Sequence, residues 1–180
     1  MATSTELLMI KEYIKSYKDF PVKGIDFKCI ASLCSNEKGF RKANNYLYDK
    51  LLSVGPVDKI IGIDARGFIF ASILSYKFNK PLILARKAGK LPGNCISKEF
   101  KLEYGTSIIE IQNESIYEKE RVIIIDDLMA TGGTVQAVVD IVKDMKAIPV
   151  AVGCVIDLSF LEGSKKIKEQ GINFYAATNY

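Results

Sequence analysis

Residues 121–134 read RVIIIDDLMATGGT, and this stretch decides the fold class of the chain. The four β-branched residues at 122–125 are typical of a strand that is buried on both faces of a parallel sheet. Asp126 and Asp127 follow at once, and the small residues at 130–134 lead into a segment with apolar residues at helical spacing. The stretch therefore predicts a buried strand, a loop rich in glycine and threonine, and a helix over 134–145.

The same alternation of strand and helix extends to both sides of this stretch. Short apolar runs predict further strands at 59–63, 82–85, 108–111, 150–156 and 172–175. Helical spacing predicts a helix at 40–51, and further helices are expected at 68–78, which Asn79 and Pro81 end, and at 161–170. A capping box of Thr3 and Glu6 predicts a first helix that extends to Tyr17, and residues 19–30 are expected to form a loop with short extended pieces. This order predicts an α/β domain with a mainly parallel, twisted sheet flanked by helices.

The composition is that of one globular domain. The 180 residues are 48% hydrophobic and 26% charged, so we expect a single domain over 1–180 with a substantial core. No apolar run approaches the roughly 20 residues that span a bilayer, and the first residues do not read as a signal peptide, which predicts a cytoplasmic protein. The net charge of +4 is too small to indicate a nucleic-acid partner.

The residue types available also limit the chemistry. The chain has no histidine, which excludes every Ser–His or Cys–His nucleophile and every histidine metal ligand. Its cysteines form neither a Cys-x-x-Cys pair nor a zinc-ligand spacing, and they are expected to be small apolar residues in a reducing cytosol. They are Cys29, Cys34, Cys95 and Cys154. The sequence therefore predicts no dedicated metal site.

Ligands of parallel α/β sheets bind beyond the carboxyl ends of the strands, which draws attention to the segments 64–67, 86–104 and 126–134. In the last of these, small residues let backbone N–H groups approach an anion, and the helix start adds a partial positive charge. The two carboxylates can accept hydrogen bonds from neighbouring hydroxyls and offset positive charge in an oxocarbenium-like transition state. A ribose 5-phosphate satisfies both halves of this site. Its predicted contacts are Asp126, Asp127, Ala130, Thr131, Gly132, Gly133 and Thr134.

Other interpretations of the same residues fit less well. The dinucleotide fingerprint G-x-G-x-x-G is absent, and the pattern of a P-loop fails because Gly67 is followed by Phe68 rather than lysine. Neighbouring residues of a strand point in opposite directions, so Asp126 and Asp127 are a poor glycosidase pair. The alternative without a binding function is that residues 126–134 are only an acidic strand end followed by an ordinary helix cap.

Three segments carry a resemblance to a known family. Residues 122–134 (VIIIDDLMATGGT) resemble the phosphoribosyl-pyrophosphate (PRPP) motif of the type I phosphoribosyltransferases, and residues 64–68 (DARGF) resemble their purine-type pyrophosphate loop. Residues 86–104 contain RKAGKLPGN and LEYG, which are similar to the adenine branch of that family. The resemblance covers residues 19 to about 166. It implies the type I phosphoribosyltransferase fold, with a small hood over 19–35 and a mobile lid loop over 86–106.

The resemblance also implies roles for individual residues. Pyrophosphate would be bound by Ala65, Arg66, Lys87 and Lys90. Glu103 and Tyr104 would close over the reaction centre and form the catalytic set together with Arg66. Adenine would lie between Phe27 and Leu158, beside Asp26 and Lys28. The last two depart from the family pattern, because Asp26 stands in place of an apolar residue and Lys28 in place of an arginine whose planar fork it lacks.

The activity implied is the transfer of the 5-phosphoribosyl group from PRPP to adenine, which gives AMP and pyrophosphate in purine salvage. Mg²⁺ would be held mainly by the phosphates of the substrate, as this ion prefers. We expect a cytoplasmic homodimer with adenine and PRPP as its small-molecule partners and no nucleic-acid or membrane partner. The altered hood leaves a transferase for another base open. A PRPP- or nucleotide-sensing regulator without catalysis also stays open, although neither a helix-turn-helix nor a basic arm is found.

Overall fold

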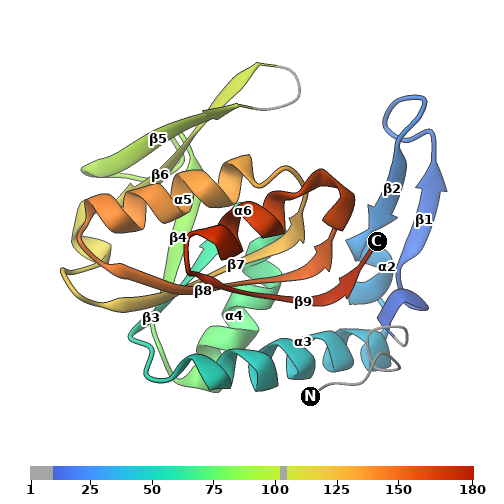
Figure 1. Ribbon diagram of the computed structural model, residues 1–180, viewed down its shortest axis with the longest axis horizontal. Coiled ribbons are helices and arrows are strands. Elements are labelled where there is room, and N and C mark those ends of the chain that lie inside the picture. Colours follow the sequence, from blue (N-terminus) through green and yellow to red (C-terminus); the bar gives the residue numbers. More distant parts are fainter. Residues whose placement is uncertain (1–9, 102–104) are drawn as a thin grey trace.

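The computed structural model describes residues 10–101 and 105–180, and a seven-stranded sheet organises them (Figure 1). The strand order is β5-β6-β4-β3-β7-β8-β9. The strands are β3 (Lys59–Ile63), β4 (Leu82–Lys87), β5 (Cys95–Lys101), β6 (Thr106–Gln112), β7 (Arg121–Met129), β8 (Ile148–Asp157) and β9 (Asn173–Asn179). The helices are α2 (Ile30–Cys34), α3 (Glu37–Leu51), α4 (Gly67–Phe78), α5 (Gly133–Asp144) and α6 (Gly163–Glu169), with short 3₁₀ turns at η1 (Leu52–Val54), η2 (Asn113–Ser115) and η3 (Ser159–Leu161).

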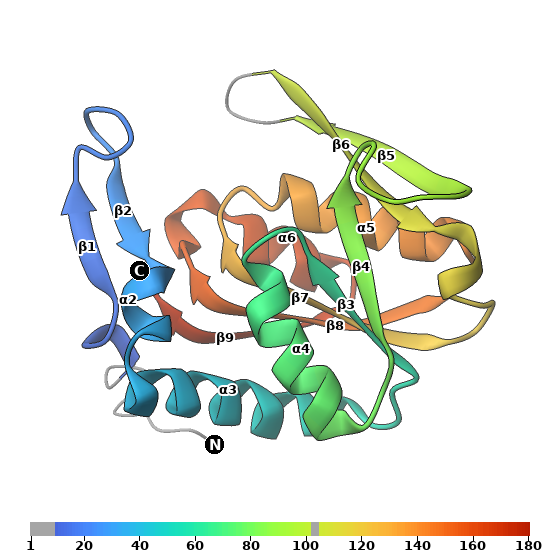
Figure 2. The ribbon, with the colours of Figure 1, turned by 180° about the vertical axis from the view of Figure 1, so that it is seen from behind.

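The predicted fold class is confirmed. Strands β4, β3, β7, β8 and β9 pair in parallel, and β5 and β6 add an antiparallel edge. Residues 122–125 of β7 are fully buried at the middle of the sheet, which is why they are apolar on both faces. Helices α5 and α6 cover one face, and α2, α3 and α4 cover the other (Figures 1 and 2). Among the described residues, no helix is both long and apolar enough to cross a bilayer.

A separate two-stranded antiparallel ribbon stands beside the main sheet. It consists of β1 (Lys15–Lys18) and β2 (Asp26–Cys29), with Tyr17 opposite Phe27. The predicted end of the first helix at Tyr17 was therefore wrong, because Tyr17 lies in a strand. Of the described residues between 10 and 18, only 10 and 11 are helical. Pairing with β2 outweighs the weak helical preference of this short segment. Thr3 and Glu6 lie outside the described residues.

A hairpin arm replaces most of the loop predicted over 86–104. Strand β4 continues to Lys87, and β5 pairs with β6 from Cys95 opposite Gln112 to Lys101 opposite Thr106. The arm rises away from the body of the molecule (Figures 1 and 2). The irregular loop was a wrong prediction over 95–101, where the residues form a strand by pairing with β6. Because residues 102–104 are outside the described range, the lid role of 86–106 stays a prediction.

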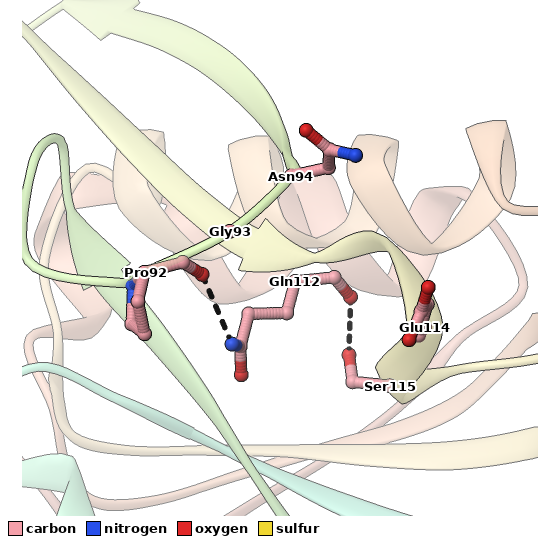
Figure 3. Close-up of a pocket in the computed structure, with 6 residues that line it drawn as sticks. All are labelled: Pro92, Gly93, Asn94, Gln112, Glu114 and Ser115. Atoms are coloured by element: carbon pink, nitrogen blue, oxygen red, sulfur yellow. Dashed lines mark hydrogen bonds between the residues drawn. The ribbon is translucent and has the colours of Figure 1, made fainter.

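A shallow pocket lies where β5 begins and β6 ends (Figure 3). In it, the Gln112 side-chain amide donates a hydrogen bond to the carbonyl of Pro92 at 3.1 Å, and the Ser115 hydroxyl donates to the carbonyl of Gln112 at 2.6 Å. The lining residues are Pro92, Gly93, Asn94, Gln112, Glu114 and Ser115. These bonds join the connection between β4 and β5 to the end of β6 and so fix the base of the arm.

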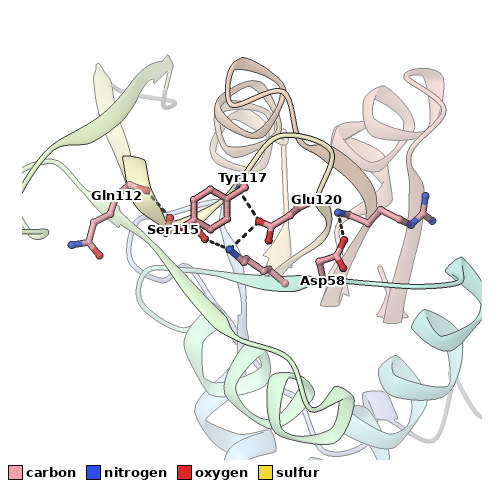
Figure 4. A network of polar contacts seen from close by, with 7 residues as sticks. Asp58, Gln112, Ser115, Tyr117 and Glu120 are labelled. Carbon is pink, nitrogen blue, oxygen red and sulfur yellow. Dashed lines mark hydrogen bonds and ion pairs between the residues drawn. The ribbon is translucent and has the colours of Figure 1, made fainter.

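A polar network holds the amino ends of the central strands together (Figure 4). The Lys59 ammonium lies 2.9 Å from the Glu120 carboxylate and donates to the carbonyl of Ser115 at 2.8 Å. The backbone N–H of Arg121 donates to the Asp58 carboxylate at 2.8 Å. This network lies at the edge opposite the carboxyl ends of β3 and β7, so it supports the fold away from the predicted site.

Candidate functional site

The predicted loops meet at one edge of the sheet. Because β4, β3, β7 and β8 are neighbouring parallel strands, the segments that follow them lie side by side. Two ion pairs join these segments directly. Arg66 Nε is 2.9 Å from Asp127 Oδ2, and Arg86 Nε is 3.1 Å from Asp64 Oδ2. The sheet thus brings together the pyrophosphate and PRPP segments that are about 60 residues apart in the sequence.

The two carboxylates lie within β7 rather than after it. Strand β7 extends to Met129, so Asp126 and Asp127 both belong to the strand itself. Asp126 Oδ1 accepts a hydrogen bond from the backbone N–H of Asp127 at 2.8 Å. The Asp127 side chain is only 6% exposed, and within the described residues its Oδ2 accepts no hydrogen bond and is matched only by the ion pair with Arg66. This buried oxygen therefore faces the Arg66 guanidinium, at a distance suited to an ion pair.

Burial controls the charge of this pair. It raises the pKa of Asp126 well above its ordinary value, and the neighbouring Asp127 carboxylate raises it further. Burial also raises the pKa of Asp127, while the Arg66 guanidinium opposes that rise. Asp127 therefore has a cation that supports its ionised form, whereas Asp126 holds a proton more readily. The two neighbours are electrostatically unequal, although they are the same residue type.

The loop between β7 and α5 leads into a helix start without a side-chain cap. Gly132 has a φ of +85°, a left-handed conformation that glycine adopts without strain, and it precedes α5 with no side-chain cap. The first helical hydrogen bond runs from the N–H of Gln136 to the carbonyl of Gly132. The N–H groups of Gly133 and Thr134 therefore lie at a helix start that no side chain caps, where the helix dipole attracts an anion. The structure confirms the predicted loop and helix, with the helix starting one residue earlier.

Sequence reasoning missed two residues of α6 that contact this loop. A Cβ added to Gly163 would overlap the carbonyl oxygen of Ala130 and lie 2.8 Å from the Gly132 nitrogen. The Lys166 ammonium donates to the carbonyl of Thr131 at 3.5 Å. Both residues line a small pocket together with the loop; the complete lining is Thr131, Gly132, Gly133, Gln136, Gly163, Lys166 and Ile167. The only signal in the sequence was a glycine at a predicted helix start, which does not indicate what it packs against.

Asp157 holds the start of α6 in place. This buried carboxylate at the end of β8 accepts hydrogen bonds from the hydroxyls of Ser159 and Ser164, both at 2.9 Å. Ser164 is itself buried and follows Gly163 directly. The close approach of α6 to the Gly132 loop therefore rests on a polar anchor within the protein.

The pyrophosphate segment is linked to the root of the arm by Arg86, a residue that sequence reasoning did not single out. Besides its ion pair with Asp64, Arg86 donates through Nη1 to the carbonyl of Lys90 at 3.3 Å. Lys87 and Lys90 are exposed beside it, and so are Ala65 and Arg66 in the loop that precedes α4. Arg86 thus connects the segment that carries Lys87 and Lys90 with the segment that carries Ala65 and Arg66.

The predicted base contacts come from two different parts of the fold. Phe27 lies in the ribbon, where it is partly buried and meets the ring of Phe20 edge-on at 5.1 Å between centroids. Leu158 follows β8, and its N–H donates to the carbonyl of Met129 at 2.8 Å. Asp26 and Lys28 form an ion pair of 2.8 Å on the ribbon. Glu103 and Tyr104 lie outside the described residues.

An uncapped helix start beside a buried carboxylate suits a sugar phosphate, and the family comparison agrees. Residues 30–173 match the family model described as "Phosphoribosyl transferase domain". Fold and site together define the chain as a phosphoribosyltransferase domain.

Individual relatives identify the branch. An adenine phosphoribosyltransferase of Chlorobium chlorochromatii is 40% identical over 172 residues, which cover 95% of this chain and 97% of the relative. The crystal structure of the Rhodothermus marinus adenine phosphoribosyltransferase superposes with a TM-score of 0.90 at 31% identity, over 99% of this chain and 100% of the other. The Saccharomyces cerevisiae enzyme, in complex with an imino-altritol bisphosphate and adenine, gives a TM-score of 0.88 at 29% identity over 97% and 99% of the two chains. The chain belongs to the adenine phosphoribosyltransferase family, which confirms the resemblance seen in the sequence.

Proposed function

We propose how this chain carries out the reaction of its family, in which adenine and PRPP give AMP and pyrophosphate in purine salvage. The observation that carries the proposal is the position of the uncapped α5 start beside the buried Asp127 carboxylate. The helix start binds the 5-phosphate, and the carboxylates accept hydrogen bonds from the ribose hydroxyls. The sugar is thereby held with its anomeric carbon beside negative charge that stabilises an oxocarbenium-like transition state.

The two aspartates have different roles in this proposal. Asp127 is paired with Arg66, whose positive charge supports its ionised form, so it supplies the ionised carboxylate toward the ribose. Asp126 has the more strongly raised pKa and orients the pair through its hydrogen bond with the Asp127 N–H. The loop residues Ala130, Thr131, Gly132, Gly133 and Thr134 surround the phosphate, because small side chains let the backbone donors approach it.

The positive corner of the site is proposed to bind the leaving pyrophosphate. Arg66 is half exposed and offers a planar guanidinium beside the ribose carboxylates, while Lys87 and Lys90 extend the positive charge from the root of the arm. The backbone of Ala65 belongs to the same loop. As adenine forms its bond to the anomeric carbon and the pyrophosphate leaves, these cations stabilise the negative charge that develops on the departing oxygen. The roles of Glu103 and Tyr104 at the reaction centre remain predictions from the sequence.

Mg²⁺ is proposed to enter with the substrate. Within residues 10–101 and 105–180, no cluster of three or more side chains of the metal-binding types is present. The two neighbouring aspartates are the donors that the site offers, and a pair of this kind suits an ion whose other ligands are water and diphosphate oxygens. When bound, the ion would neutralise charge on the pyrophosphate.

The base site is proposed to lie between the ribbon and the end of β8. Phe27 and Leu158 would cover the two faces of adenine, and the backbone around Asp26 and Lys28 would contact its edge. Lys28 is already engaged by Asp26, so its charge is partly neutralised before adenine binds. The altered residues are thus compatible with a neutral base.

A homodimer and a cytoplasmic location complete the proposal. Helix α4 is mostly apolar, with Ile69 and Tyr76 39% and 88% exposed, and Leu84 of β4 is 37% exposed. A second copy of the chain would cover these side chains, and sedimentation velocity tests this expectation. The four cysteines are unpaired, which agrees with a reducing compartment.

The decisive experiment compares the wild type with Asp127→Asn. Purified protein, PRPP and Mg²⁺ are mixed in turn with adenine, guanine, hypoxanthine and xanthine, and nucleotide and pyrophosphate are quantified. We expect AMP from adenine alone and a loss of at least about tenfold in turnover for the variant, with a much smaller change in stability. Turnover within about twofold of the wild type would refute the ribose-site assignment. Reaction with another base would refute the base-site assignment, and PRPP binding without any turnover would indicate a sensor.

A further inference from the structure

Lys28 on the ribbon is held by three partners. Its ammonium donates to the Asp26 carboxylate at 2.8 Å and to the Ser16 hydroxyl at 2.9 Å, both within the ribbon. It also lies 4.2 Å from the centroid of the Tyr180 ring, a distance at which the ring face attracts a cation. The Lys28 side chain is only 10% exposed, so this contact is largely shielded from water.

Tyr180 belongs to the body of the molecule rather than to the ribbon. It follows β9, which brings it beside β2 (Figures 1 and 2). Its N–H donates to the carbonyl of Asp157 at 2.9 Å, and its own carbonyl accepts from the N–H of Ser159 at 3.1 Å. These two bonds enclose Leu158, so the position of Tyr180 is fixed relative to the proposed base contact.

We propose that Tyr180 is a positioning residue for base binding, because its ring holds Lys28 and thereby sets the spacing between Phe27 of the ribbon and Leu158 of the body. This inference rests on the proposed function, in which those two side chains enclose adenine. Tyr180 itself does not need to contact the base.

The exposure of the ribbon explains why one contact can matter. Phe20 and Val22 at its turn are each 53% exposed, and Tyr17 is 49% exposed, so these apolar side chains do not fix the ribbon to the core. Lys28 lies one residue after Phe27, and its largely buried side chain contacts Tyr180 of the body. A shift of the Lys28 ammonium would therefore move Phe27 relative to Leu158, whereas the PRPP loop on β7 and α5 would be unaffected.

The test compares Tyr180→Leu with Tyr180→Phe. Leucine keeps an apolar side chain but lacks the ring face, and phenylalanine keeps the ring while losing the hydroxyl. For Tyr180→Leu we expect an increase of about fivefold in the KM for adenine, as a partly shielded cation–π contact is lost, with kcat and the KM for PRPP within about twofold. Tyr180→Phe should match the wild type in all three quantities.

Lys28→Met tests the same contact from the other side. It should also raise the KM for adenine. Lys28→Met further removes the bonds to Asp26 and Ser16, and Tyr180→Leu also removes the contact of the Lys11 ammonium, which lies 4.8 Å from the same ring centroid. The Lys28–Tyr180 contact is nevertheless lost in both single variants, so the double variant should be less impaired than the sum of the two single effects. If Tyr180→Leu does not fold, the inference is tested with Lys28→Met alone and with Lys28→Met combined with Tyr180→Phe. Both proteins should show the same raised KM for adenine, and an unchanged KM in Lys28→Met would overturn the inference.

Several outcomes would overturn the inference. These are an unchanged KM for adenine in Tyr180→Leu, an equal increase in the KM for PRPP, additive effects in the double variant, or a Tyr180→Phe variant as impaired as Tyr180→Leu. A wild-type protein that does not use adenine would instead refute the proposed function. The wild-type measurement therefore separates the two failures.

Discussion

Gly163 provides the sharpest prediction about the phosphate loop. In Gly163→Ala, the added Cβ would lie 2.8 Å from the Gly132 nitrogen and 2.9 Å from the Thr131 carbonyl carbon, and it would overlap the Ala130 oxygen. Ordinary van der Waals contact begins at 3.4 Å, so the Gly132 backbone must move by about 0.6 Å and the Ala130 oxygen by more. These atoms are backbone, and they cannot rotate away as the end of a side chain can.

This displacement falls on the groups proposed to bind the 5-phosphate. A misplacement of about 1 Å in a binding element can cost about 100-fold in rate, so we expect kcat/KM for PRPP to fall by about 10- to 100-fold. That range corresponds to about 1.4 to 2.7 kcal/mol of transition-state stabilisation. The KM for adenine should stay within about twofold, because the ribbon and Leu158 are not displaced. Steady-state kinetics with each substrate varied in turn measures both quantities.

Gly171→Ala is the matched control. A Cβ at Gly171 meets no atom within 4 Å, but its φ of +76° strains any other residue. This variant should lose about 1 kcal/mol of stability with unchanged kinetics for PRPP. A folded Gly163→Ala protein with kcat/KM for PRPP within twofold of the wild type would refute the reasoning, and so would an equal kinetic loss in Gly171→Ala.

Three further predictions concern the carboxylates, the arginine and the metal. Burial raises the pKa of Asp126 above the unfolded value of about 4, so this residue's contribution to stability is fully present below that pH and is lost as the pH rises through the native pKa. Asp126→Asn should therefore unfold at higher urea concentration than the wild type near neutral pH, and the difference should shrink toward pH 4; a constant difference would contradict this. Arg66→Lys should weaken product inhibition by pyrophosphate about tenfold, since a point charge replaces the planar fork, and an unchanged inhibition constant would exclude Arg66 from that site. Chelation by EDTA should abolish turnover and leave the unfolding temperature unchanged, whereas a lowered temperature would reveal a resident structural ion.

Local signals predicted the central part of the fold. The β-branched run at 122–125, the helical spacing of α3 and α5, and the small residues at 130–134 each depend on neighbours within one turn or one strand. The strands β3, β7 and β8 are buried on both faces, so a short run of apolar residues is enough to predict each of them as a strand. The resemblance to the family then indicated which ligand each loop is expected to bind, which the spacing of apolar residues does not show.

Elements at the edge of the molecule were harder to predict. Residues 15–18 form β1 only because β2 is available as a partner, and β5 is recognisable as a strand mainly through its pairing with β6. Edge strands have one neighbour and one exposed face, so their composition resembles that of a loop. The lid was accordingly predicted without its hairpin.

The sequence by itself determined the class of site, because Asp126, Asp127 and the glycine–threonine loop are contiguous and local chemistry suffices to interpret them. Only the tertiary structure decided the contacts between distant segments. These are the pair of Arg86 with Asp64, the approach of Gly163 to the phosphate loop, and the contact of Tyr180 with Lys28. The physical reason is that such contacts depend on how the sheet places strands side by side, and no periodicity within a single segment records that placement.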